Sequence, residues 1–256
     1  ALFTALTMGF RFGARLTAQL PRPDPASQTG EPADSSIAVD AVGHAYTSGH
    51  DVLSGVDLAL RPGERIALVG ASGAGKTTLA KLIAGVHTPT TGQVRIGGVA
   101  VTALDPAVPR AAVVLVTQEV HTFAGTLAED LRLAHLGATE ADLVAALDKV
   151  GALAWARALP DGLVTVVGAG GHRLTATQAQ HLALARLVLA DPLIAILDEA
   201  TAEAGSAGAR VLEAAALRAL DGRTARVVEI GTHSELTAGD GPYAHLWATW
   251  SRARTG

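Results

Sequence analysis

The 256-residue chain contains no cysteine, few charged residues and few aromatic residues. Without cysteine it has no disulfide framework, no thiolate zinc site and no cysteine nucleophile. Charged residues make up 17%, hydrophobic residues 49%, and the mean hydropathy is +0.31. This composition excludes a disordered chain and indicates a globular protein that can cover part of its surface with a partner. The net charge of -4 excludes the strongly basic surface typical of nucleic-acid binding.

Long apolar runs are also missing, because no stretch of about 18 uninterrupted apolar residues occurs. Residues 1–20 come closest, but Arg11 and Arg15 interrupt them. They fit the end of a membrane helix and an amphipathic surface helix equally well. Because the chain begins with Ala, we expect a piece of a longer protein. Residues 1–20 would then be the end of a membrane-proximal helix, residues 21–36 a proline-rich linker, and residues 37–256 one folded domain.

Within that domain, hydrophobic patterning predicts strands that alternate with helices, which indicates an α/β fold. The expected strands cover residues 37–42, 56–60, 65–69, 93–96, 111–116 and 193–197. The expected helices cover residues 76–84, 125–133, 141–159, 178–189, 206–220 and 243–250.

The clearest motif is Gly70-Ala71-Ser72-Gly73-Ala74-Gly75-Lys76-Thr77, which fits G-x-x-x-x-G-K-[ST] at every fixed position. An expected strand precedes it and an expected helix follows it. Glycines let backbone N–H groups approach phosphate oxygens, and a helix N-terminus adds partial positive charge. We therefore expect Lys76, one of only three lysines, to reach the terminal phosphates and the Thr77 hydroxyl to bind Mg²⁺.

The second motif is acidic: Asp198 and Glu199 directly follow the apolar strand expected over residues 193–197. Ligands of parallel sheets bind at the carboxyl ends of the strands. Asp198 would hold Mg²⁺ beside Thr77, and Glu199 would orient or deprotonate the attacking water. Acidic residues often follow strands without such a role, so the pair indicates a magnesium site only in combination with the glycine-rich motif.

Other motifs resemble those of the ATP-binding cassette (ABC) ATPases, and the likeness covers residues 37–250. The run 198–201 is similar to the family's D-E-A-T, and Leu174-Thr175-Ala176-Thr177-Gln178 stands where the family has L-S-G-G-Q. Residues 114–118 resemble the Q-loop. Residues 121–127, the glycine-rich residues 167–171 and residues 231–236 resemble segments of ABC exporters.

This resemblance implies the ABC ATPase fold: a P-loop NTPase core sheet, an antiparallel β subdomain and a helical signature subdomain. It implies that Tyr46 stacks on adenine, a contact worth about 1–3 kcal/mol; the alternative is an aromatic residue that covers the core. Gln118 would contact Mg²⁺ and the attacking water, and Glu199 would be the catalytic carboxylate. Thr78 would complete the ATP-binding residues.

Three departures from the family pattern affect these expectations. Ala176 and Thr177 replace the two signature glycines, and their Cβ atoms would crowd the ATP of the opposite protomer. Residues 202–205 lack the family's cross-dimer aspartate. After Ala225, on the order of 20 residues with the switch histidine are missing, and His233 lies beyond that gap. Either the protein has lost this stretch and is impaired, or the encoded protein contains it and this sequence omits it.

The function that follows from the resemblance is ATP binding and hydrolysis for an ABC exporter at the cytoplasmic face of the cell membrane. The expected partners are a transmembrane domain and a second nucleotide-binding domain, in a heterodimer with one degenerate site and without nucleic acid. The alternatives are a nucleotide-binding regulatory subunit with little turnover and a soluble ABC ATPase outside transport. A small GTPase is disfavoured because no N-K-x-D motif occurs.

Overall fold

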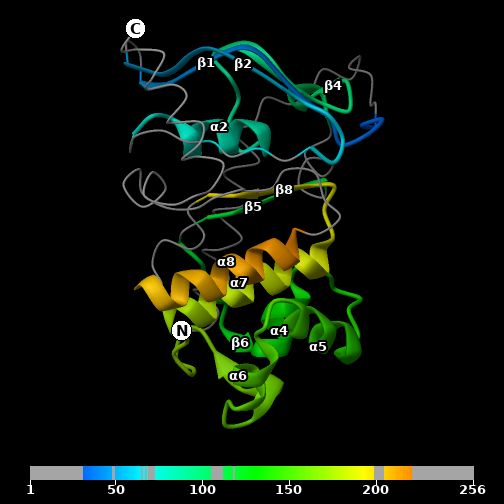
Figure 1. The fold of residues 1–256 in the computed structure, drawn as a ribbon, viewed down its shortest axis with the longest axis vertical. Coiled ribbons are helices and arrows are strands. Elements are labelled where there is room, and N and C mark those ends of the chain that lie inside the picture. The colour runs from blue at the N-terminus through cyan, green and yellow to red at the C-terminus, as the bar shows by residue number, and fades with distance from the viewer. Residues whose placement is uncertain are drawn as a thin grey trace, which may run out of the picture.

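A computed structural model describes residues 31–47, 50–64, 66, 68, 73–104, 112–117, 119–198 and 205–220, with side chains from residue 211 in the last segment. These residues form three layers, an antiparallel sheet, a central parallel strand pair and a group of helices, which follow one another along the long axis of the molecule (Figure 1). The expected mixture of strands and helices is confirmed. No helix among the described residues is both long and apolar enough to cross a membrane.

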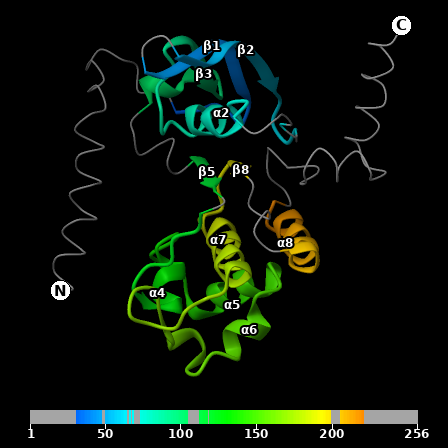
Figure 2. The same ribbon diagram turned by 90° about the vertical axis from the view of Figure 1, so that its left-hand side faces the viewer.

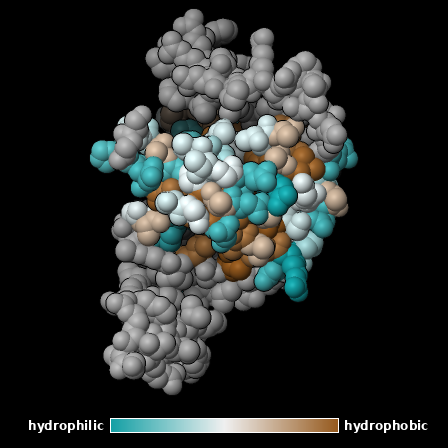
Figure 3. All heavy atoms as spheres, turned by 90° about the horizontal axis from the view of Figure 1, so that it is seen from above, coloured by the Kyte–Doolittle hydropathy of each residue, from teal (hydrophilic) through white to brown (hydrophobic). Residues whose placement is uncertain are grey.

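The first layer is a four-stranded antiparallel sheet in the order β2-β1-β3-β4. Its strands are β1 (Ile37–Thr47), β2 (His50–Leu60), β3 (Thr91–Ile96) and β4 (Val99–Ala100). Ile37 pairs with Leu60 on one side and with Ile96 on the other, and all three side chains are buried. The opposite face is mixed, with polar residues between smaller apolar areas (Figure 3). One face therefore packs inward, as the alternation of an antiparallel sheet requires.

The buried face of this sheet packs on helix α2 (Lys76–Ile83), and below α2 lie the parallel strands β5 (Val113–Val116) and β8 (Ile194–Leu197) (Figure 2). A short 3-10 turn, η1 (Val101–Ala103), follows β4. The strand pair contributes to two hydrophobic cores. Val113 and Ile194 belong to the core around α2, and Val116 and Leu197 belong to the core among the helices. This two-sided burial explains why β8 is continuously apolar.

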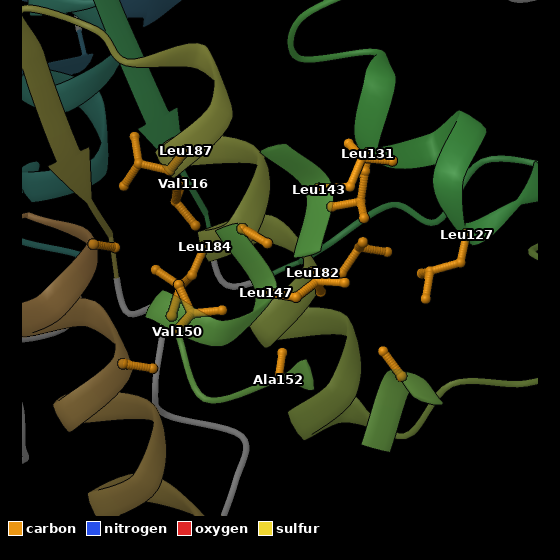
Figure 4. Packing of buried hydrophobic residues seen from close by; sticks show 14 of the residues in the cluster. Val116, Leu127, Leu131, Leu143, Leu147, Val150, Ala152, Leu182, Leu184 and Leu187 are labelled. Carbon is orange, nitrogen blue, oxygen red and sulfur yellow. The ribbon is translucent and has the colours of Figure 1, made fainter. Parts of the chain in front are cut away.

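The helical layer surrounds α7 (Ala176–Ala190), in which Leu182, Leu184 and Leu187 are fully buried. Figure 4 shows these leucines packed against residues of α4, α5 and β5. Fully burying one such side chain is worth about 1.5–3 kcal/mol. The other elements are β6 (Gly125–Thr126), α4 (Leu127–Arg132), α5 (Glu140–Lys149), α6 (Leu153–Arg157), η2 (Gly162–Val164), β7 (Val166–Val167) and α8 (Gly205–Ala219).

Several expected elements differ in the structure. The helix expected over residues 125–133 begins only at Leu127, because Gly125 and Thr126 form strand β6 and Thr126 caps the helix. The helix expected over residues 141–159 is two helices, α5 and α6, because Gly151 between them has φ +74°. Of the strand expected over residues 65–69, only Ile66 and Leu68 are described, and both are irregular. The expected helix over residues 243–250, the membrane-proximal helix over residues 1–20 and most of the linker lie outside the described residues.

Candidate functional site

The start of α2 has the backbone geometry that a phosphate-binding loop needs. Gly75 is the N-cap and has φ 84°, and its carbonyl accepts the first helical hydrogen bond from Leu79 N at 2.9 Å. A Cβ at Gly75 would lie 2.5 Å from Leu53 Cδ2 and 3.0 Å from the Val52 carbonyl oxygen. Conformation and close packing on β2 therefore both require glycine there.

The other loop residues follow from this anchor. Gly73 has φ 81°, and a Cβ there would meet no atom of the described residues within 4 Å. Lys76, Thr77 and Thr78 form the first turn of α2, and the N-terminal N–H groups and dipole of a helix attract anions. An open glycine turn followed by lysine and two hydroxyls fits a triphosphate. Gly70, Ala71 and Ser72 lie outside the described residues, and Ala74 is exposed.

The acidic motif lies at the carboxyl ends of β5 and β8. These strands pair in parallel from Val113–Ile194 to Val116–Leu197, and Asp198 N donates to the Val116 carbonyl at 2.8 Å. Asp198 therefore leaves the sheet beside the segment that leads to Gln118. Gln118 and Glu199 themselves lie outside the described residues. Among the described residues, no group of three or more His, Cys, Asp or Glu side chains could hold a metal ion.

Tyr46 lies near the end of β1 and contacts the first turn of α2. Its hydroxyl is hydrogen-bonded to Thr78 Oγ1 at 3.1 Å, while 54% of the residue is exposed. Its ring stands edge-on to the rings of His44 and His87, which stack on each other. The structure thus places Tyr46 beside the start of α2, and the stacking of its ring on adenine stays a prediction. Sequence reasoning missed both histidines; only the spacing of His44, two positions before Tyr46 on the same strand, could have indicated one.

The signature segment forms the N-terminus of α7. Thr175 is the N-cap: its hydroxyl accepts a hydrogen bond from Gln178 N at 3.2 Å, and the Gln178 side chain accepts one from Thr175 N at 2.9 Å. This capping box starts the helix two residues earlier than expected. Ala176 and Thr177 are both within the helix, so local backbone conformation does not require glycine at either position.

The segment after Gln118 is joined to the signature region through several contacts. Strand β6 pairs with β7, which leads through residues 168–171 toward α7. Phe123 N donates to the buried Asp130, and Asp130 accepts from Arg186 of α7. Arg186 also donates to the His121 carbonyl at 2.9 Å. Neither Asp130 nor Arg186 was singled out from the sequence, since each is an ordinary polar residue in an expected helix.

Two departures noted in the sequence, at residues 202–204 and after Ala225, fall outside the described residues, as does His233. Helix α8 begins at Gly205 and packs on α7 through Ala215, Ala216 and Ala219.

Comparison with known proteins gives consistent results. The family described as ABC transporter matches residues 53–202, more than half of the chain. An ATP-dependent lipid A-core flippase of Chromobacterium violaceum is 36% identical over 78% of this chain and 36% of its own length. A multidrug efflux ATP-binding/permease protein of Mycobacterium bovis is 35% identical over 93% of this chain and 22% of its own length.

Another relative is named for import: the mycobactin import ATP-binding/permease protein IrtB of Mycolicibacterium thermoresistibile. It is 37% identical over 83% of this chain and 40% of its own length. The chain therefore spans well under half the length of these relatives. The family match, the G-x-x-x-x-G-K-[ST] motif at the start of α2 and the three-layer fold agree with one another. The chain belongs to the ABC transporter family, whose ATP-binding domains hydrolyse ATP.

Proposed function

We propose that this chain is the nucleotide-binding domain of an ABC exporter, in which it binds and hydrolyses Mg-ATP to drive transport. The observation that carries the proposal is the start of α2, where Gly75, Lys76 and Thr77 follow one another in the geometry of a phosphate site. Two relatives that cover most of the chain are named for lipid flipping and drug efflux. The glycine-rich residues 167–171 also resemble the exporter type.

The proposed roles follow from the positions of the residues. The loop from Gly70 to Thr77 and the hydroxyl of Thr78 hold the phosphates, with Lys76 contacting the terminal ones. Thr77, Asp198 and Gln118 would hold Mg²⁺, which neutralises charge on the phosphates when bound. Glu199 orients and deprotonates the attacking water, and Tyr46 stacks on the base.

The proposed assembly is a head-to-tail pair of nucleotide-binding domains under a transmembrane domain, at the cytoplasmic face of the membrane. Residues 1–20 would end the last membrane helix, residues 21–36 would link it, and residues 37–256 would form the ATPase domain. Because Ala176 and Thr177 would crowd the ATP held by the other protomer, the partner would be a different chain with a glycine-containing signature.

Thermal unfolding with and without Mg-ATP tests nucleotide binding. At a hundredfold excess over Kd, a ligand stabilises the fold by about 2.7 kcal/mol. Lys76→Ala should remove the rise in Tm, whereas Lys149→Ala, which changes an exposed lysine at the end of α5, should keep it. An equal rise in the parent and in Lys76→Ala would contradict the proposal.

The altered signature and the missing switch histidine favour a second candidate, a regulatory subunit that holds ATP with little turnover. ATP hydrolysis by the assembled transporter separates the two. In the exporter function, Glu199→Gln keeps the Mg-ATP shift in Tm and lowers turnover by on the order of a hundredfold or more. In the regulatory function, the parent and Glu199→Gln show the same low turnover.

A further inference from the structure

Three aromatic rings meet beside the proposed nucleotide site. The rings of His44 and His87 stack with centroids 5.6 Å apart and an interplanar angle of 18°. The ring of Tyr46 stands at 89° to His44 and 84° to His87, with centroid distances of 4.9 Å and 5.5 Å. Edge-to-face pairs at such separations are favourable. The two histidines therefore hold a ring whose hydroxyl is already bonded to Thr78.

His44 is buried, and a backbone carbonyl holds its ring in place. The residue is 9% exposed, and its Nδ1–H donates to the Thr88 carbonyl at 3.1 Å. Its Nε2 is buried and meets no hydrogen-bond partner among the described residues.

The surroundings of His87 lower its pKa. Partial burial lowers its pKa most, followed by the positive charge of Lys81 on α2 and by His44 on β1. The titratable groups that face the stacked pair are thus Lys81, Tyr46 and the two imidazoles themselves. A positive charge on His87 beside Lys81 is unfavourable, so protonation of His87 works against the packed arrangement of the three rings.

We propose that His44 and His87 are positioning residues for Tyr46, and that protonation of the His87 imidazole releases the Tyr46 ring and weakens binding of the adenine base. The inference rests on the proposed function, because it requires Tyr46 to stack on a bound nucleotide. A ring that is ordered before binding loses less conformational entropy when the base arrives. When acid has released the Tyr46 ring, the ring must be ordered again each time a base binds.

The experiment compares two probes, Mg-ATP and the magnesium complex of inorganic triphosphate, at pH 7.5 and pH 5.8. Triphosphate occupies the phosphate loop alone, and any pH effect that comes from protonation of the two probes is the same for the parent and for the variants. For the parent chain, the preference for Mg-ATP should fall roughly threefold to tenfold on acidification. For the double variant His44→Phe/His87→Phe, which keeps the rings and removes the protons, the preference should not change with pH.

Two further variants complete the test. His87→Phe alone, at a half-buried position that accepts phenylalanine more easily, should already reduce the pH dependence. His135→Phe, at an exposed position after α4, should leave it as in the parent. A preference that falls equally in the parent and in the double phenylalanine variant would overturn this inference alone, as would a parent whose preference ignores pH. If the parent binds no Mg-ATP at pH 7.5, the proposed function fails and this inference with it.

Discussion

Asp130 and Arg186 form an ion pair in which the arginine Nε donates to the carboxylate at 2.7 Å, and the Asp130 side chain has no exposed surface. The pair joins α4 to α7 and also fixes the segment before α4, since Asp130 accepts from Phe123 N at 2.8 Å. The guanidinium also lies over the Phe123 ring, 5.5 Å from its centroid. Burial raises the pKa of Asp130, while Arg186 opposes that rise. One side chain of the signature helix thus organises the segment that follows Gln118.

Removing Arg186 should strongly destabilise the chain. Arg186→Ala leaves Asp130 buried without its cation, a change that typically costs about 3–5 kcal/mol. Arg186→Lys should recover part of the loss, because lysine restores the charge but cannot bond to Asp130 and the His121 carbonyl in the same geometry. Urea unfolding at pH 7 measures both. Arg157→Ala, an exposed arginine on α6, is the control, and an equally small loss in Arg157→Ala and Arg186→Ala would refute the importance of the pair.

Gly75 should tolerate alanine less well than another glycine with a similar backbone. Gly63 has φ 76°, and a Cβ there would meet no atom of the described residues within 4 Å. Gly63→Ala therefore adds conformational strain of about 1–2 kcal/mol but no clash with those residues. Gly75→Ala adds the same strain and also pushes a Cβ against Leu53 and the Val52 carbonyl. We expect a larger loss of unfolding free energy and loss of the Mg-ATP shift in Tm only for Gly75→Ala. Equal effects of the two substitutions would show that packing at the loop is unimportant.

Local sequence signals predicted much of this fold, and their limits have physical causes. The apolar run before Asp198 predicted β8 correctly because a strand buried on both faces has no polar alternation. The same periodic reading joined α5 to α6, although Gly151 could have indicated the break, since its left-handed backbone ends the first helix.

The contacts around the site could not be predicted in the same way. His44 and His87 come from segments far apart in the sequence, and so do Asp130 and Arg186. Whether such residues come into contact depends on how elements distant in the sequence pack together, and no local pattern predicts that packing. The start of α2 at Gly75 was predictable because the motif G-x-x-x-x-G-K-[ST] consists of consecutive residues and places its lysine at the start of one helix.

Acid should weaken the packing of α7 on α8 through His181. This histidine is 4% exposed, and burial lowers its pKa first, with a further contribution from the charge of Arg218 on α8. The unfolded chain, with the ordinary pKa near 6.5, then binds the proton more readily than the folded chain. The neutral His181 imidazole therefore stabilises the folded chain fully above about pH 6.5, and this stabilisation is lost as the pH falls below that value.

Urea unfolding at pH 7.5 and pH 5.5 measures this loss. His181→Leu should lose less stability between the two pH values than the parent does, whereas the exposed His172→Ala should follow the parent. A parent and a His181→Leu variant with the same pH dependence would refute this role of His181.

The signature helix offers the sharpest test of the proposed heterodimer. Ala176 and Thr177 are already helical, so Ala176→Gly/Thr177→Gly gains nothing in the folded chain and should lower its stability by about 1–2 kcal/mol through helix propensity. Any gain in ATP turnover by this variant must therefore arise where the helix end faces ATP in another protomer. We expect the parent chain alone to be nearly inactive and to become active with a partner whose signature contains glycine. The glycine variant should become more active by itself only if the encoded protein contains the switch histidine. Strong cooperative ATPase activity from the unmodified chain alone would mean that its own signature is competent and that no different partner is needed.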